Sequence, residues 1–79
     1  QGYDAYTAKN YEEAANLLGS VIKYDEMNGN AFYYYAQSCR QLERNDEAIM
    51  AYKKVLELVP ADTERAKTAR NHLNRLEAN

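Results

Sequence analysis

The chain has 79 residues, of which 46% are hydrophobic and 28% are charged, and its formal net charge is -2. This length allows one domain at most, and the composition is typical of a soluble globular chain rather than a disordered one. Nucleic-acid-binding proteins more often carry a clear positive excess, so the charge argues against nucleic acid as a partner. No apolar run approaches about 18 residues, so direct membrane insertion within this segment is not expected.

The start of the chain suggests a fragment, because it begins with Gln1 rather than methionine. Residues 2–9 are expected to form the end of a first helix whose beginning lies upstream. Without that upstream cover, an apolar edge near Ala5, Ala8 and Tyr11 would be exposed. Exposed patches of this kind recruit partners, so we expect possible homo-oligomers through the N-terminal end.

A second helix is predicted over residues 11–24. Asn10 precedes it and Glu13 follows three residues later, which is the spacing of a capping box. The turn-rich stretch 25–30 ends this helix, and Gly29 is expected to take a positive φ there.

A third helix is predicted over residues 31–43, with Asn30 as its cap. Its apolar stripe consists of Phe32, Tyr35, Ala36, Cys39 and Leu42. The chain has one cysteine, which can form no internal disulfide and has no metal-binding residue at useful spacing. Cys39 is therefore interpreted as a small buried hydrophobe.

The fourth predicted helix, residues 45–59, has the clearest pattern in the chain. Apolar residues at 48, 49, 52, 55, 56 and 59 form one stripe, and Pro60 ends the run. Asn45 or Asp46 is expected to cap its start. Ala48 is expected to face the preceding helix at close range, whereas Ala51 lies off the stripe and should accept a larger residue.

A fifth helix is predicted over residues 63–78, capped by Asp62 or Thr63. Its stripe consists of Ala66, Ala69, Leu73 and Leu76. Arg70 stands where the earlier helix has the small residue Ala36, so no helix is expected to pack behind it. We interpret this helix as a solvating cap on the hydrophobic end of the array.

Residues 11–24 and 45–58 repeat one plan at a period of 34 residues. Glu13 matches Glu47, Ala14 matches Ala48, Leu18 matches Tyr52, Val21 matches Val55, and Ile22 matches Leu56. With Phe32, Tyr35, Ala36, Cys39 and Pro60 also in place, the chain resembles the tetratricopeptide repeat family. Its usual Gly-Asp-Tyr turn is replaced here by Glu43-Arg44-Asn45.

The resemblance implies an all-α fold of antiparallel helix-turn-helix repeats, a TPR solenoid with a C-terminal capping helix. Residues 1–28 would be a partial repeat, 29–62 a full repeat and 63–79 the capping helix. The last helix is also similar to that of bacterial cell-envelope repeat proteins, including the Tol-Pal-associated periplasmic group. This narrower resemblance favours a bacterial cell envelope over the cytoplasm.

Catalysis finds little support in the sequence. His72 is the only histidine and is interpreted as a surface residue, while Ser20 and Ser38 fall inside helices without a histidine in reach. No phosphate-binding glycine loop is present. We therefore expect no enzyme, no cofactor and no metal; an enzyme subdomain stays open only because the parent protein is unseen.

Binding is better supported. By family position, the inner face would present Tyr3, Tyr6, Thr7, Asn30, Tyr33, Tyr34, Gln37, Arg40, Gln41, Lys67, Asn71 and Asn74. Tyrosine offers large contact area, a polar tip and few rotatable bonds, which suits a peptide groove. The resemblance thus implies a non-catalytic scaffold that binds a protein or peptide partner through a Tyr-rich concave face.

Alternatives remain for the tyrosines and for the function. Tyr11, Tyr24, Tyr35 and Tyr52 fit core stripes, whereas Tyr33 and Tyr34 point off their stripe and should be partly exposed. Tyr3 and Tyr6 could simply pack against Tyr33 or Tyr34. The alternative function is a structural or self-assembly module that mediates homo-oligomerisation of a larger protein. Chaperone-binding members clamp a C-terminal carboxylate with Lys and Asn on successive inner helices; only Lys67 and Asn71 match here.

Overall fold

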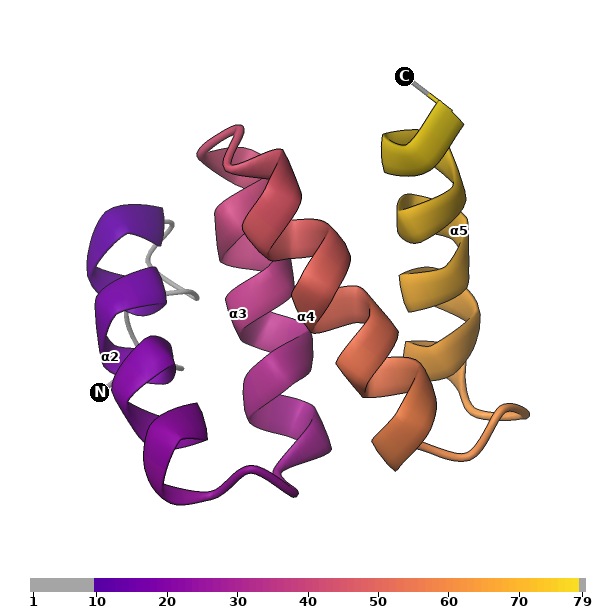
Figure 1. Ribbon diagram of the computed structural model, residues 1–79, viewed down its shortest axis with the longest axis horizontal. Helices are drawn as coiled ribbons and strands as arrows, with labels where there is room; N and C mark the ends of the chain where they lie inside the picture. Colours follow the sequence, from indigo (N-terminus) through magenta and orange to yellow (C-terminus); the bar gives the residue numbers. More distant parts are fainter. Residues whose placement is uncertain (1–9, 79) are drawn as a thin grey trace.

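A computed structural model describes residues 10–78 of the chain. The described helices are α2 (Tyr11–Tyr24), α3 (Gly29–Gln41), α4 (Asn45–Leu58) and α5 (Glu64–Ala78). They lie side by side in chain order, each packed against the next (Figure 1). No strand occurs in the described range, so the all-α prediction is confirmed. The expected first helix, with Ala5 and Ala8, lies outside the described residues.

Two of the predicted caps are confirmed. The Asn10 side chain accepts a hydrogen bond from the Glu13 amide over 3.4 Å, and its own amide donates to Glu13 Oε1 over 3.1 Å. This is the reciprocal pair of a capping box. Thr63 Oγ1 accepts from the Ala66 amide over 3.3 Å at the start of α5.

The other two predicted caps are wrong. Asn28, not Asn30, caps α3: its side chain accepts from the Ala31 amide over 3.0 Å, so the helix begins two residues earlier than expected. Arg44 precedes α4 and makes no side-chain capping bond there. Asn45 is consequently the first residue of the helix, and its neighbour Asp46 contributes charge to the first turn rather than a cap.

The α3–α4 turn depends on a left-handed residue. Glu43 has φ 61°, the only non-glycine residue with positive φ among residues 10–78. The Arg44 amide donates to the Cys39 carbonyl over 2.8 Å, and the Glu43 amide donates to the Arg40 carbonyl over 3.1 Å. These two bonds define a Schellman motif, which glycine usually closes. Glutamate here replaces the glycine of the family pattern.

Gly29 does not have the positive φ expected for it. It is the first residue of α3, and a Cβ placed on it would lie 2.7 Å from Val59 Cγ2. Glycine is needed there because the start of α3 closely approaches the end of α4.

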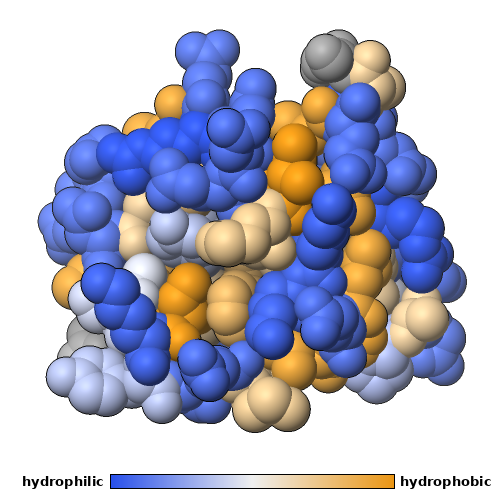
Figure 2. Space-filling view, viewed as in Figure 1, coloured by the Kyte–Doolittle hydropathy of each residue, from blue (hydrophilic) through white to orange (hydrophobic). Residues whose placement is uncertain are grey.

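The buried core follows the four helices. One cluster joins α3, α4 and α5, and consists of Phe32, Ala36, Cys39, Ala48, Ala51, Tyr52, Val55, Ala69 and Leu73. A smaller cluster of Ala14, Leu18 and Ala31 joins α2 to α3. Apolar residues show between the hydrophilic rows of α4 and α5 (Figure 2). Burial of Cys39 confirms its interpretation as a structural residue.

The buried side of α4 is wider than a single stripe. Ala48 is fully buried, as predicted, but so is Ala51. The expectation that Ala51 would accept a larger side chain is therefore wrong. The reason is that α4 packs against α3 and also against α5, which extends its buried arc.

The tyrosines expected in the core differ in burial. Tyr52 is fully buried, whereas Tyr11 and Tyr35 are only half-buried. Tyr24 is 94% exposed, so its assignment to the core is wrong. It is the last residue of α2, and no neighbouring helix covers its side chain there. Tyr33 and Tyr34 are partly exposed, as predicted.

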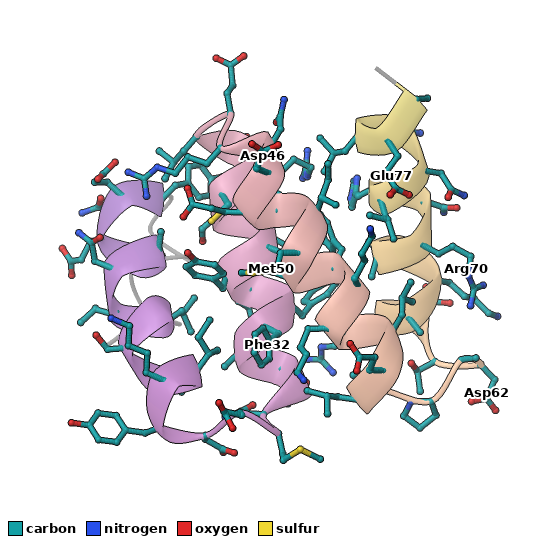
Figure 3. All side chains as sticks on the ribbon, in the orientation of Figure 1. Phe32, Asp46, Met50, Asp62, Arg70 and Glu77 are labelled. Atoms are coloured by element: carbon teal, nitrogen blue, oxygen red, sulfur yellow. The ribbon has the colours of Figure 1, made fainter. Side chains whose placement is uncertain are left out.

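Helix α5 presents a polar outer side. Arg70 is exposed and points away from α4, whereas Leu73 is buried (Figure 3). This exposure agrees with the interpretation of α5 as a solvating helix.

Candidate functional site

A cluster of two tyrosines and an arginine joins α3 to α5. The rings of Tyr33 and Tyr34 meet edge to face, with centroids 5.3 Å apart and planes at 80°. The guanidinium carbon of Arg65 lies 5.8 Å from each ring centroid, within cation–π range. Arg65 Nη2 also donates to the Tyr34 hydroxyl over 3.5 Å. We call these residues the Tyr33–Tyr34–Arg65 cluster.

The α3 residues further along belong to a chain of hydrogen bonds centred on Tyr52. Arg40 Nε donates to the Tyr52 hydroxyl over 3.3 Å, and that hydroxyl donates to Gln37 Oε1. Gln37 Nε2 in turn donates to the Tyr33 hydroxyl over 3.4 Å. The buried phenol of α4 is thereby satisfied, and the chain connects it to the first cluster.

His72 of α5 completes the second group. Its ring stacks on Tyr52, with centroids 5.6 Å apart and an interplanar angle of 30°. Partial burial lowers the pKa of His72, and the nearby positive charges of Arg40 and Arg75 lower it further. We call Gln37, Arg40, Tyr52, His72 and Arg75 the Tyr52 cluster. His72 is half-buried and packed on Tyr52 rather than simply a surface residue.

The predicted site residues are thus only partly brought together. Tyr33, Tyr34, Gln37 and Arg40 take part in the two clusters, although Gln37 is 8% exposed and acts mainly inside the fold. Asn30, Gln41, Lys67, Asn71 and Asn74 are exposed on α3 and α5. Tyr3, Tyr6 and Thr7 lie outside the described residues, so the idea that Tyr3 or Tyr6 packs on Tyr33 or Tyr34 stays untested.

Sequence reasoning missed Arg65, His72 and Arg75 as members of this surface. The 34-residue period relates Arg65 to Ala31, which is a buried position. Repeat position alone therefore gives no signal for it. Only the packing of α5 beside α3 places a guanidinium over the two tyrosine rings.

A second surface lies between α2 and α4. A hollow of about 600 Å³ there is lined by Ile22, Lys23, Glu26, Phe32, Met50, Lys53, Lys54 and Glu57. A smaller hollow of about 380 Å³ continues it and shares Ile22, Lys23 and Met50. Figure 3 labels two residues that line the larger hollow, Phe32 of α3 and Met50 of α4. The charged side chains that line it are of both signs: three lysines and two glutamates.

The titratable groups inside the fold have structural roles. Burial raises the pKa of the Cys39 thiol, which favours its protonated form. Burial also raises the pKa of Tyr35, whose hydroxyl donates to Glu47 Oε2 over 3.0 Å. Residues 10–78 contain no group of side chains suited to hold a metal ion. No helix in the same range is long and apolar enough to cross a membrane.

Comparison with known proteins identifies the repeat. A model of the tetratricopeptide repeat family matches residues 1–63. Superkiller complex protein 3 of Homo sapiens is 39% identical over 57 residues, which cover 72% of this chain and 4% of that protein. The Mus musculus protein of the same name gives the same values. Tetratricopeptide repeat protein 37 of Xenopus laevis is 33% identical over 57 residues, with the same coverage.

These matches bear on the expected resemblances in different ways. The predicted tetratricopeptide resemblance is confirmed. The resemblance to bacterial cell-envelope proteins is not supported, because the three relatives come from vertebrates. The chain spans only 4% of the length of these relatives. No solved structure matches it.

Proposed function

Because the chain belongs to the tetratricopeptide repeat family, whose domains bind protein partners, we propose that it is a non-catalytic scaffold that binds a peptide segment on the α3–α5 surface. The binding surface comprises the Tyr33–Tyr34–Arg65 cluster and the exposed residues of α3 and α5 beside it. The Homo sapiens relative is named as a protein of a complex, which is compatible with a scaffold role.

The observation that carries the proposal is the arrangement of Tyr33 and Tyr34. Both rings are partly exposed, yet each has a defined position because they contact each other and Arg65. Binding to side chains that are already fixed costs less conformational entropy than binding to mobile ones. Tyrosine and arginine are also the residue types in which binding energy concentrates.

The test begins by selecting ligands from a library of random short peptides with the folded chain as bait. The selected peptides are then titrated against Tyr33→Ala and Tyr34→Ala. Each change should weaken binding by about 1–2 kcal/mol, roughly a five- to thirty-fold rise in Kd, because an anchoring ring is lost. Circular dichroism and thermal unfolding establish that the variants remain folded.

The matched control is Tyr24→Ala, which removes the same side chain from a position that is 94% exposed at the end of α2. Its Kd should match that of the unchanged protein. Met50→Ala reports on the hollow between α2 and α4, where Met50 is 55% exposed.

Three outcomes would count against the proposal. If Met50→Ala weakens binding and the α3 tyrosine changes do not, the partner uses the hollow. If the tyrosine changes lower thermal stability without affecting binding, the rings serve packing. If they change the mass of the chain in solution, the face mediates self-association instead.

A further inference from the structure

Charge is divided unequally between alternate helices. The basic residues of α3 and α5 are Arg40, Arg65, Lys67, Arg70 and Arg75, against the two acidic residues Glu64 and Glu77. The acidic residues of α2 and α4 are Glu12, Glu13, Asp46, Glu47 and Glu57, against the three basic residues Lys23, Lys53 and Lys54. The two helices that carry the proposed binding surface thus have five basic against two acidic residues, a net charge of +3, in a chain of net charge -2.

The carboxylate of Glu77 does not neutralise that surface, because it pairs with Lys53 of α4 over 3.3 Å. Among residues 10–78, Arg40, Lys67 and Arg75 form no ion pair. Helix α3 contains no acidic residue at all. The positive charges of Arg40, Lys67 and Arg75 are therefore not neutralised by an ion pair within the described range.

The basic side chains form two centres on this surface. Arg65 lies over the Tyr33 and Tyr34 rings near the starts of α3 and α5. Arg40 lies near the end of α3, bonded to Tyr52, whose ring stacks on His72. Three residues further along α5 stands Arg75.

The helical rise gives the separation of the two centres. Tyr33 and Arg40 are seven residues apart on α3, and Arg65 and Arg75 are ten residues apart on α5. At about 1.5 Å per residue, the centres lie about 10–15 Å apart. An extended peptide covers that distance in roughly three to five residues.

We infer that the partner segment on this surface is acidic, with carboxylate side chains roughly three to five residues apart that meet Arg65 at one centre and Arg40 with Arg75 at the other. This inference rests on the proposed function, because it specifies the chemistry of the segment bound there. A guanidinium presents N–H donors in a planar fork that matches a carboxylate. The tyrosine rings would contact apolar side chains between the two acidic residues.

An acidic peptide fits the charges better than a nucleic acid does, although both are anions. The helices and loops around this surface are acidic, and the whole chain is negative. A phosphate backbone would meet that negative field along its length, whereas a short peptide would not.

The probe is a synthetic peptide with a fluorescein label and an amidated C-terminus. Its glutamates stand about four residues apart, with leucine and tyrosine between them. Amidation removes the terminal carboxylate, so only side chains are tested. A second peptide carries glutamine at each glutamate position. We expect the glutamate peptide to bind at least about tenfold more tightly at low salt, and this preference to shrink as salt screens the charges.

Arg65→Gln and Arg75→Gln should each reduce the preference for glutamate over glutamine to about a third or less of its value, since each removes one cationic centre. Both residues are exposed, so folding should be retained. Arg70→Gln is the matched control: it removes the same charge from the same helix, but Arg70 points away from α4 (Figure 3). Its preference should match that of the unchanged protein.

The outcomes separate this inference from the proposed function. Equal binding of both peptides, with loss of both in Tyr34→Ala, would overturn the acidic preference and leave the scaffold proposal standing. Failure of the glutamate peptide to bind, or an equal effect of Arg70→Gln, would also overturn the inference. So would a labelled oligouridylate that binds more tightly than the glutamate peptide and depends on Arg65 and Arg75.

Discussion

Glu43 has an unfavourable backbone conformation that the folded chain nevertheless retains. Its φ of 61° is a left-handed conformation, which costs a residue with a Cβ about 1–2 kcal/mol. The conformation is retained because the Schellman bonds from Arg44 to Cys39 and from Glu43 to Arg40 close the end of α3. Glu43 is exposed, so its side chain contributes little packing in return.

Glu43→Gly should therefore raise the free energy of unfolding by about 0.5–1 kcal/mol, the relief of strain outweighing the greater freedom of glycine in the unfolded chain. Urea unfolding at fixed pH measures the change. Glu43→Ala is the control, since it removes the same charge but keeps the strain; it should stay within about 0.5 kcal/mol of the unchanged protein. A glycine variant that is less stable than the alanine variant would contradict this explanation.

His72 links stability to pH. Burial first, and then Arg40 and Arg75, lower its pKa in the folded chain below the ordinary 6.5. The unfolded chain consequently binds the proton more readily, so stability falls as the pH drops through about 6.5 and below. Because carboxylates also titrate in acid, the relevant quantity is a difference between variants.

His72→Phe keeps a ring on Tyr52 and removes the titration. We expect the melting temperature of the unchanged protein to fall relative to His72→Phe between pH 7 and pH 5, and to differ by a constant amount above pH 7. Differential scanning calorimetry across that range measures it. A parallel pair of curves throughout would mean that the pKa of His72 is the same in the folded and unfolded chain.

At the scale of elements, two glycines within helices allow the effect of close packing on stability to be separated from the effect of helix propensity. A Cβ on Gly29 would lie 2.7 Å from Val59 Cγ2, whereas a Cβ on Gly19 inside α2 would lie 3.4 Å from the ring of Tyr35. The first contact is an overlap with a stiff, β-branched side chain, and the second is ordinary van der Waals contact.

Gly29→Ala should thus destabilise the fold by about 1–3 kcal/mol, and Gly19→Ala should stabilise it by about 0.5–1 kcal/mol. Combining Gly29→Ala with Val59→Ala should recover part of the loss, giving a non-additive double-mutant cycle. The same urea experiment serves for the unchanged protein and the four variants. Stabilisation by both alanines would show that the start of α3 can move away from α4.

The helices could be predicted from the sequence because their signals are local and repeated. The 34-residue period and the apolar stripes place α2 and α4 within one residue of their observed ends. The start of α3 was missed because Asn28 and Asn30 are equally good caps, and only the bond to the Ala31 amide distinguishes them. The burial of Ala51 was missed because a single stripe does not reveal that α4 has two neighbours.

At the scale of the whole molecule, only part of the proposed site could be predicted from the sequence. Tyr33 and Tyr34 could be predicted as partly exposed because they lie off the apolar stripe of α3. The burial of Gln37 and the position of Arg65 depend on how α4 and α5 pack beside α3, which periodicity does not specify. The same limit explains Tyr24. Its periodic position predicts burial in the core, but its side chain is exposed at the end of α2.

The two ion pairs between residues of the described range, 10–78, also have a mechanical consequence. Arg44 pairs with Glu12 over 2.8 Å and Lys53 with Glu77 over 3.3 Å, so each bridge crosses from one helical pair to the next. Both bridges are accessible to dissolved ions, which screen them, whereas the contacts in the apolar clusters between the helices are not screened. An array of such units would act as a coil spring that softens slightly as salt screens the bridges, because each exposed bridge contributes about 0–1 kcal/mol and the apolar clusters cross the same junctions.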